Sequence, residues 1–517
     1  MPKKKNILLI APTCDERMAD ETLMSPCLGI VRIAGYLKSG GHYAEYIDLN
    51  LEYFIKTFTF EEKLKEREWD IIGFSTLEET LIADIQHMNI AKQFCPDALI
   101  VAGGQEAQFN FQTFLNKSPA RIVVLGEGEI PMLMLANEVS MEKIPGIVVK
   151  NEAIPLTNEE YWDATKAIDW ENIPYEKYWD YYVEKYGDAL NKQSDLEIHT
   201  ARIFSKNRCP YGCNYCTSTN QLTWAADKQG VQIVGVTADN IISIIERIIQ
   251  SHPRVKTIYF TDDDFCVIPK ELIVFCKKVV EKNFNVTFMC LARMTDLNEQ
   301  SIKWMAKAKF RNLNMGVETF SDKILKDISK KCTTDVIHQN IKYLQQYNID
   351  LYMNILIVTP ESTLEDIEET IYWVAYYMQN ENINAGINPW VCPLKGSNYY
   401  EMYADYATRV ERIPNTNHYI KRELMIYVKD PYIRELQERL FNEMDEATKL
   451  KREEQGIIHA TATNMAMIDL EYIRDIIQEI RVKYNLGQSK FFDKMDFIDV
   501  PEPSAHHQHF CSFHDNS

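Results

Sequence analysis

The 517-residue sequence lacks any apolar run long enough for a membrane helix, which needs about 18 or more consecutive apolar residues. Near the amino terminus, Lys3–Lys5 precede the apolar run Asn6–Pro12. That run is short, and no small-residue cleavage site follows it. We therefore expect a first β-strand rather than a signal peptide, and a cytoplasmic protein with no membrane partner.

Basic residues are in the minority, with 56 Lys and Arg against 75 Asp and Glu, for a formal net charge of −19. A protein with this charge repels a phosphate backbone overall, so we expect no nucleic-acid partner. Two nucleotide-binding motifs are also missing. No G-x-G-x-x-G follows the first apolar run, and the sequence has no G-x-x-x-x-G-K. A dinucleotide or nucleoside triphosphate cofactor is therefore disfavoured.

Short β-rich runs alternate with helical patterns over residues 1–150. Such alternation implies a parallel sheet covered by helices on both faces. We predict an α/β fold whose N-terminal domain, residues 1–150, is a flavodoxin-like (Rossmann-type) doubly wound sheet. The five expected strands are Asn6–Pro12, Tyr43–Asn50, Asp70–Thr76, Ala98–Gly104 and Arg121–Gly128.

Residues 151–200 break this rhythm and are rich in Tyr, Trp, Asn and acidic residues, which we interpret as a linker packed across the next domain. From 201 to 395 the alternation resumes and predicts a partial (β/α)6 barrel, although periodicity alone does not distinguish it from a second open sheet. After 395 the strand signals fade, so we expect residues 396–517 to form a mainly helical substrate-binding or cap region. The six expected barrel strands are Arg202–Lys206, Thr257–Thr261, Asn285–Ala292, Asn312–Glu318, Leu351–Val358 and Asn384–Val391.

Cys209, Cys213 and Cys216 form a C-x3-C-x2-C motif in the loop after the first barrel strand. Three thiolates on one short loop are suited to three irons of a cubane, with Gly212 allowing the backbone to wrap round the sulfides. The fourth iron is then open to a small ligand. A structural zinc site is the alternative, but zinc prefers four ligands and C-x2-C pairs, and only His199 is available nearby.

This motif resembles that of the radical S-adenosylmethionine (SAM) enzymes, which usually have an aromatic residue before the last cysteine, as Tyr215 is here. The resemblance implies a [4Fe–4S] cluster on the three cysteines, whose fourth iron chelates the amino and carboxylate groups of SAM. Reductive cleavage then yields a 5′-deoxyadenosyl radical. An external electron donor of the flavodoxin or ferredoxin type is expected as a partner.

The same resemblance places SAM contacts further along the barrel. Segment Ile258–Phe265 resembles the one that reaches the methionine moiety, and Arg293 and Gly316–Glu318 resemble the family's ribose and carboxylate contacts. Two alternatives stay open: a solvated turn for the aspartates, and a helix N-cap partner for Glu318. The implied SAM contacts are Tyr215, Asp262, Asp263, Asp264, Arg293 and Glu318.

Small residues and glycines follow the N-terminal strands, where an open parallel sheet binds ligands and where a large, flat ligand needs close approach to the backbone. Together with Pro26–Gly29 and Gly73–Leu77, they resemble the cobalamin-binding domain that precedes the barrel in one class of radical SAM enzymes. No D-x-H-x-x-G motif is present, which leaves the lower ligand of cobalt open. The implied cobalamin contacts are Pro12, Ser75, Thr76, Leu77, Gly103, Gly104, Gly126, Glu127 and Gly128.

The resemblance implies a methyltransferase that acts on an unactivated carbon of a small-molecule or peptide substrate, through the deoxyadenosyl radical and methylcobalamin. A rearrangement, ring contraction or cyclisation without methyl transfer is the enzymatic alternative. The other alternative is an N-terminal domain that only docks a partner and binds no cobalamin. Methylthiolation of tRNA is disfavoured by the acidic charge and by the lack of a second cysteine triplet.

Three further features have weaker interpretations. The tail His506–His514 has metal-binding residue types, but clustered histidines at a terminus often have no role. Trp390 and Tyr399–Tyr400 are candidates for the substrate pocket. The scattered cysteines of the barrel are expected to be buried apolar residues, namely Cys266, Cys276, Cys290, Cys332 and Cys392.

Overall fold

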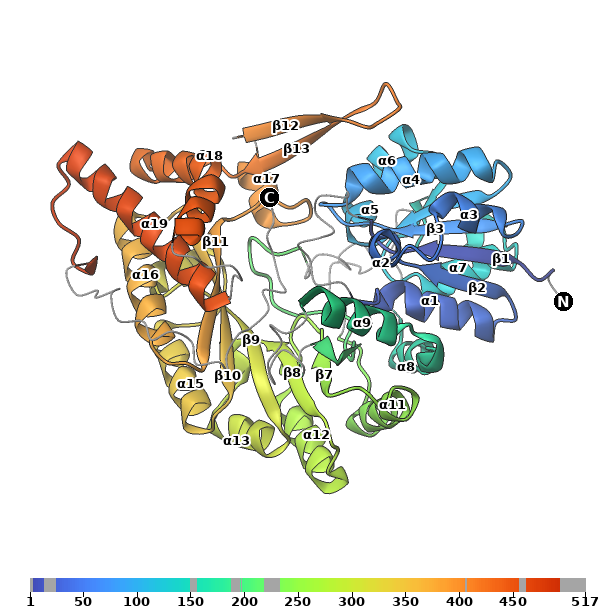
Figure 1. Cartoon of the computed structure of the whole chain (residues 1–517), viewed down its shortest axis with the longest axis horizontal. Helices are drawn as coiled ribbons and strands as arrows, with labels where there is room; N and C mark the ends of the chain where they lie inside the picture. The colour runs from blue at the N-terminus through green and yellow to red at the C-terminus, as the bar shows by residue number, and fades with distance from the viewer. Residues whose placement is uncertain are drawn as a thin grey trace.

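The computed structural model describes residues 3–13, 25–148, 156–186, 196, 198–217, 233–404, 407–454 and 462–492. Two parallel sheets lie side by side, and further helices and a hairpin pack against them (Figure 1). The tail His506–His514 lies outside the described residues. Among the described helices, none combines the length and apolar character that a membrane span requires.

The N-terminal sheet has the strand order β2-β1-β3-β4-β5, and every pair is parallel, which confirms the flavodoxin-like prediction. Successive side chains of β1 are buried on opposite faces. Leu8 and Ile10 pack with α3, α4 and α6, whereas Ile7 and Leu9 pack with α1 and α7. The strands are β1 (Asn6–Ile10), β2 (Tyr43–Ile47), β3 (Ile71–Ser75), β4 (Leu99–Gly103) and β5 (Ile122–Val123), and the helices are α1 (Leu28–Ser39), α2 (Leu49–Ile55), α3 (Phe60–Lys65), α4 (Leu81–Phe94), α5 (Gln105–Phe109), α6 (Phe111–Lys117), α7 (Glu129–Ala136) and the 3₁₀ turn η1 (Met141–Lys143).

The second sheet has its six strands in sequential order, all parallel, as a partial (β/α)6 barrel requires. The outer helices cover it, as Figure 1 shows. Its strands are β6 (Thr200–Ile203), β7 (Thr257–Phe260), β8 (Thr287–Ala292), β9 (Phe310–Glu318), β10 (Asp350–Val358) and β11 (Ile383–Trp390), and its helices are α11 (Ala238–Ser251), α12 (Pro269–Lys282), η7 (Met294–Asp296), α13 (Glu299–Lys307), α14 (Asp322–Asp327), α15 (Thr334–Gln346) and α16 (Leu364–Met378).

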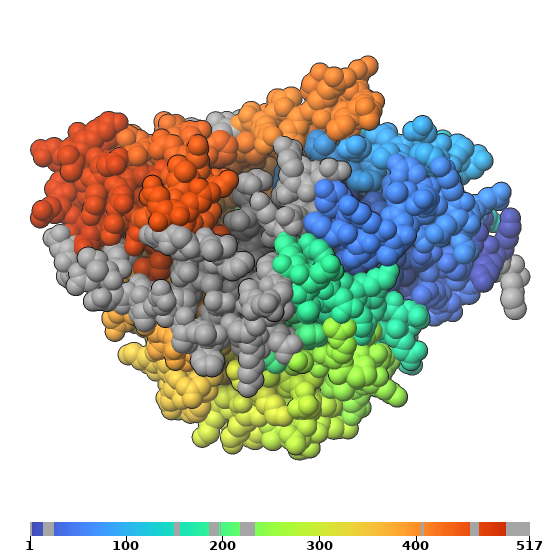
Figure 2. All heavy atoms as spheres, viewed as in Figure 1, coloured from blue at the N-terminus to red at the C-terminus, as the bar shows by residue number. Residues whose placement is uncertain are grey.

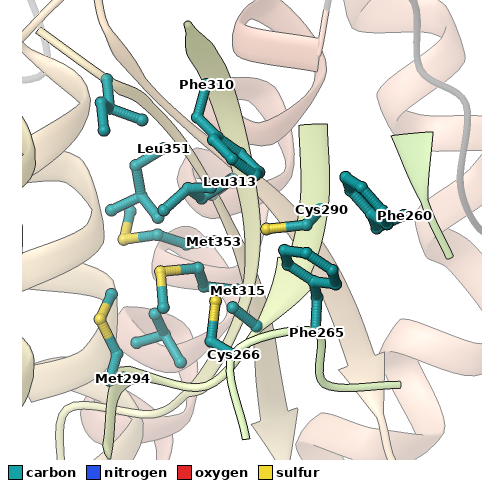
Figure 3. Packing of buried hydrophobic residues seen from close by; sticks show 14 of the residues in the cluster. Phe260, Phe265, Cys266, Cys290, Met294, Phe310, Leu313, Met315, Leu351 and Met353 are labelled. Carbon is teal, nitrogen blue, oxygen red and sulfur yellow. The ribbon is translucent and has the colours of Figure 1, made fainter. Parts of the chain in front are cut away.

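The barrel interior is filled by aromatic and sulfur-containing side chains (Figure 3). The Phe260 and Phe265 rings stack with centroids 3.9 Å apart. Cys266 and Cys290 lie in this packing, and with Cys276 they are completely buried, as predicted. The prediction was wrong for Cys332 and Cys392, which are only partly buried.

The segment between the sheets contains α8 (Asn158–Lys166), η3 (Trp170–Asn172) and α9 (Tyr175–Tyr186). Most of its aromatic residues are buried against the barrel: Trp179, for instance, belongs to the core cluster of the barrel. Arg247 of α11 donates a hydrogen bond to the Lys166 carbonyl at 2.8 Å. Tyr178 donates to Asp48 of the N-terminal domain at 2.8 Å. The segment therefore joins the two domains, and Figure 2 shows it between them.

Beyond the barrel, α17 (Asn398–Tyr403) is followed by β12 (Ala407–Arg412), β13 (Tyr419–Met425), α18 (Pro431–Glu454) and α19 (Ala462–Tyr484). The antiparallel hairpin β12–β13 was not predicted, and the rest of this described region is mainly helical, as expected. Ile413 and Ile420 of the hairpin are buried in the core of the N-terminal domain, and Lys117 donates to the Tyr419 carbonyl. Figure 2 shows the hairpin beside that domain. A contact across some 300 residues leaves no local sequence signal.

We expect Arg481→Ala to destabilise the protein. Arg481 of α19 donates to Glu368 of α16 at 2.9 Å, and the Glu368 side chain is completely buried. Removing one partner of a buried ion pair leaves an uncompensated charge, at a cost of about 3–5 kcal/mol. The urea midpoint of unfolding measures the loss. Lys490→Ala is the control, because its pair with Glu365 is exposed and we expect no measurable change.

Candidate active site

The carboxyl ends of the two parallel sheets face each other across a direct contact. Gln105 follows β4, and its Nε2 donates a hydrogen bond to Thr217 Oγ1 at 2.6 Å. Thr217 is the residue after Cys216, so the predicted cluster loop touches the predicted cobalamin-binding loop. Ligands bind at these strand ends in both kinds of fold.

The cysteine loop begins after β6. Cys209 and Cys213 are buried and Cys216 is partly exposed. The Cys216 N–H donates to the Cys213 carbonyl at 3.1 Å, which makes a tight turn between these two residues. A Cβ atom placed on Gly212 would meet nothing within 4 Å, so there is open space beside this part of the loop. Burial raises the pKa of the Cys209 thiol to about 12, so an iron ligand there must first lose its proton.

Asn214 holds the middle of this loop in place. Its backbone N–H donates to the Ile328 carbonyl at 3.0 Å and its Nδ2 to the Asp327 carbonyl at 2.6 Å. Its carbonyl accepts from the Tyr399 N–H at 2.9 Å. The loop is therefore fixed from two sides, by the β9–β10 connection and by α17.

Arg293 follows β8 and lies against the same loop. Its Nη1 is 3.3 Å from Cys213 Sγ, and its guanidinium lies 3.9 Å from the centroid of the Tyr211 ring. A second N–H, on Nη2, donates to the Lys330 carbonyl. Arg293 thus links the cysteine loop to the β9–β10 connection, while its predicted contact with SAM stays a prediction.

Glu318, Tyr215 and Lys330 form a hydrogen-bonded triad beside the cysteine loop, in which Glu318 and Lys330 are buried and Tyr215 is partly buried. Tyr215 donates to Glu318 Oε1 at 2.8 Å, and Lys330 Nζ donates to the same oxygen at 2.7 Å. Glu318 has φ of +69°, a conformation that L residues rarely adopt. A Cβ on Gly316 would lie 2.4 Å from Glu318 Oε1, so a larger residue there would have to displace the paired Glu318 carboxylate. Sequence reasoning missed Lys330.

The three aspartates after β7 have different surroundings. Asp262 is buried and accepts from the Ser205 N–H at 2.9 Å and from its hydroxyl at 3.0 Å, so it holds the start of the cysteine loop. Asp263 is exposed and Asp264 is buried. The solvated-turn alternative is therefore wrong for Asp262 and Asp264. Direct contact of any of the three with SAM stays a prediction.

Asp264 belongs to a second buried group that the sequence did not reveal. Its Oδ1 accepts from the Cys266 N–H at 3.0 Å, and Asp296 lies close to it. Burial, and then the neighbouring Asp296, raise the pKa of Asp264 to about 9. Asp296 also accepts a hydrogen bond from Tyr211 of the cysteine loop at 2.5 Å. Asp296 therefore holds the cysteine loop through Tyr211.

On the other side of the contact, a pocket of about 210 Å³ opens between the N-terminal strand ends, α1 and α7. Gly104 has φ of +92°, and a Cβ there would lie 2.6 Å from the Thr76 backbone nitrogen. The glycines therefore let the chain close tightly around the pocket. The predicted cobalamin contacts that line it are Ser75, Gly103, Gly104, Gly126, Glu127 and Gly128.

The three other predicted cobalamin contacts are not among its lining residues. Thr76 is completely buried and donates from its hydroxyl to the Gly103 carbonyl at 2.9 Å. Leu77 is exposed, and the Pro12 carbonyl accepts from Asn50 at 2.9 Å. Sequence reasoning missed Arg32 and Glu129, two buried charged residues that do line the pocket.

Glu106 of α5 is buried beside this site, and we expect it to make stability depend on pH. Burial raises its pKa from 4.5 to about 7. The folded state therefore holds this proton more tightly than the unfolded state, so stability falls as the pH rises from about 4.5 to 7, by about 3 kcal/mol. Glu106→Gln removes this loss and should be more stable than the parent at pH 8 but not near pH 4.5.

Urea midpoints measured at several pH values between 4.5 and 8 test this prediction. Glu68→Gln serves as the control because Glu68 is exposed, and it should shift the curve equally at every pH. If Glu106→Gln shifted the urea midpoint by the same amount at every pH, the raised pKa of Glu106 would be contradicted.

The cysteine loop fits a [4Fe–4S] cluster by its chemistry: three thiols, an adjacent guanidinium and open space at Gly212. Within the described residues, no three His, Cys, Asp or Glu side chains converge on a point where one metal ion would bind. A cubane does not need such a point, because each cysteine binds a different iron.

Two known protein families match the two domains that contribute to the site. Residues 203–374 match the family model of the Radical SAM superfamily, and residues 23–136 match that of the B12 binding domain. The match to a B12 binding domain disfavours the alternative of a docking module without cobalamin.

Two curated relatives are similar over most of this chain. An uncharacterized methyltransferase of Pyrococcus horikoshii is 24% identical over 378 residues, covering 71% of this chain and 77% of that protein. The anaerobic magnesium-protoporphyrin IX monomethyl ester cyclase of Rubrivivax gelatinosus is 24% identical over 384 residues, covering 70% of this chain and 64% of the cyclase. The chain thus spans less than two thirds of the cyclase's length.

A solved structure shares the fold of both domains. The cobalamin-dependent S-adenosylmethionine radical enzyme OxsB, with aqua-cobalamin bound, superposes with a TM-score of 0.65 at 14% identity, over 96% of this chain and 77% of that chain. Residues 203–374 therefore form a radical SAM domain and residues 23–136 a B12-binding domain, which together indicate a cobalamin-dependent radical SAM enzyme with a [4Fe–4S] cluster, SAM and cobalamin as cofactors.

Proposed function

We propose that the enzyme methylates an unactivated carbon of a small-molecule or peptide substrate. The observation that supports this proposal is the hydrogen bond between Gln105 and Thr217, which joins the predicted cobalamin-binding loop to the predicted cluster loop. Transfer of a group between two cofactors requires such proximity. The methyltransferase name of the Pyrococcus horikoshii relative supports the same reaction class.

When bound, the cluster and SAM supply a carbon-centred radical, and cobalamin supplies the methyl group. Cys209, Cys213 and Cys216 would hold the cluster. The remaining task of the protein is to orient the reacting groups and keep water out. The hydrogen-bonded triad of Glu318, Tyr215 and Lys330 presents a carboxylate, a hydroxyl and an ammonium group beside the cysteine loop, which suits the hydroxyl and carboxylate groups of SAM.

We expect the substrate to bind between the carboxyl end of β11, helix α17 and the β12–β13 hairpin. Tyr400 of α17 donates to Glu423 of the hairpin at 3.3 Å, and Arg422 of the hairpin lies 3.8 Å from Glu78, which follows β3. The hairpin thus bridges the barrel end and the N-terminal strand ends. An external electron donor of the flavodoxin or ferredoxin type belongs to this proposal as well.

Cyclisation or rearrangement without methyl transfer is the second candidate, and the cyclase name of the Rubrivivax gelatinosus relative favours it. The two candidate reactions can be distinguished by experiment even though the substrate is not identified. A methyltransferase of this kind must move the methyl group of SAM to its corrinoid, whereas a cyclase has no need of that step.

The test uses the full-length protein, loaded anaerobically with iron, sulfide and cobalamin, reduced with titanium(III) citrate and mixed with deuteromethyl-SAM. S-adenosylhomocysteine equal to the bound cobalamin, with the label on the corrinoid, supports methyl transfer. 5′-Deoxyadenosine without S-adenosylhomocysteine would overturn the methyltransferase proposal and leave cyclisation or rearrangement. The control is the same protein loaded with iron and sulfide but no cobalamin, which should form no S-adenosylhomocysteine.

A further inference from the structure

The pocket of the N-terminal domain is apolar along its walls but has charges at one end. Arg32 of α1 and Glu129 of α7 both line it, and their Nη2 and Oε1 atoms are 2.9 Å apart. The two residues are only 6% and 4% exposed. Burying such a pair is costly unless its remaining hydrogen-bonding positions are used. Among the described residues, Arg32 Nε has no hydrogen-bond acceptor.

The charged end of the pocket is fixed in place by its surroundings. The Arg32 guanidinium lies 4.6 Å from the centroid of the Tyr161 ring of α8. Glu127, which also lines the pocket, accepts from the Leu156 N–H at 2.9 Å. Burial and the nearby Glu129 raise the pKa of Glu127 to about 7, so at neutral pH it both donates and accepts hydrogen bonds. Donors and acceptors are therefore mixed at this end.

The size of the pocket selects which part of a corrinoid enters it. Cavities of about 150 Å³ take up a benzene ring, so about 210 Å³ accommodates a flat bicyclic ring but not a corrin macrocycle. The flat bicyclic part of a corrinoid is its lower nucleotide base. The pocket charges do not favour the nucleotide phosphate, because two carboxyl groups stand beside a single guanidinium.

We propose that Arg32, Glu127 and Glu129 recognise the lower base of the corrinoid, and that they favour a purine base over dimethylbenzimidazole. A purine offers ring nitrogens that accept from Arg32 and an exocyclic amino group that donates to the carboxylates. The methyl groups of dimethylbenzimidazole leave those positions unpaired. This inference rests on the cobalamin-binding assignment, but it does not depend on which reaction the enzyme catalyses.

Equilibrium dialysis of the full-length apoprotein against adeninylcobamide and against cobalamin, with bound cobalt as the readout, tests the proposal. We expect adeninylcobamide to bind about tenfold more tightly, because one unpaired buried polar group costs about that factor. In Arg32→Met/Glu129→Leu the preference should vanish or reverse. Removing both charges together avoids the uncompensated charge that a single substitution would leave. Glu127→Gln should reduce the preference with little change in shape.

The control is Arg481→Met/Glu368→Leu, which removes a buried pair between α16 and α19 and should keep the parent ratio of affinities. Equal affinities in the parent protein would overturn the proposal, as would an unchanged ratio in both pocket variants. If the parent bound neither corrinoid, the cobalamin-binding assignment would fail as well. If cobalt bound without a preference, only the base-recognition proposal would fail.

Discussion

Cys213→Ala is expected to lower the iron content from about four per chain to background and to abolish reductive cleavage of SAM. Cys213 is buried, its Sγ is 3.3 Å from Arg293 Nη1, and its neighbour Asn214 is held on both sides. No other cysteine of the described residues lies on this loop apart from Cys209 and Cys216. Two thiolates on a fixed loop do not retain a cubane whose third iron has lost its ligand.

Iron and sulfide analysis after anaerobic reconstitution measures this loss, and 5′-deoxyadenosine formation measures its consequence. Cys276→Ala is the matched control, because Cys276 is equally buried but lies on α12, where burial raises the pKa of its thiol. It should keep its iron. Cobalt binding should be unchanged in both variants, which separates loss of the cluster from general unfolding. Iron retained by Cys213→Ala would contradict the assignment of the triplet.

The parallel sheets were predictable because their signal is local. Strands such as β1 and β10 are buried on both faces, so they appear in the sequence as short continuous apolar runs between helical patterns. The β12–β13 hairpin has no such signal. Its strands are largely polar, and the two residues that pack into the N-terminal domain, Ile413 and Ile420, are separated by a turn. Their burial depends on a domain far away in the sequence.

The same distinction applies to the site. The cysteine triplet stands out in the sequence because its three predicted cluster ligands lie within eight residues. Lys330 and Arg32 were not, since a single basic residue in a sequence is typical of an exposed surface. Both are buried here because a carboxylate from another element neutralises them, Glu318 for Lys330 and Glu129 for Arg32. Only the fold brings these partners together.

Gly104→Ala is expected to have the opposite effect to Cys213→Ala: cobalamin is lost and the cluster is retained. Gly104 has φ of +92° and ψ of −176°, a region that only glycine adopts readily. A Cβ would also lie 2.6 Å from the Thr76 nitrogen and 2.7 Å from its carbonyl oxygen. The backbone has to move, and the cost of about 3 kcal/mol corresponds to about a hundredfold weaker cobalamin binding.

Gly41→Ala provides the matched control, because Gly41 has nearly the same φ, +91°, but a Cβ there meets nothing within 4 Å. Any effect of positive φ alone appears in both variants, whereas the clash with Thr76 appears only in Gly104→Ala. Spectrophotometric titration with cobalamin gives the affinity, and iron analysis reports on the cluster. Equal affinities for the two variants would mean that the closed backbone around Gly104 does not shape the cobalamin site. A hundredfold difference with iron unchanged would place the cofactor against the loop that Gln105 joins to Thr217.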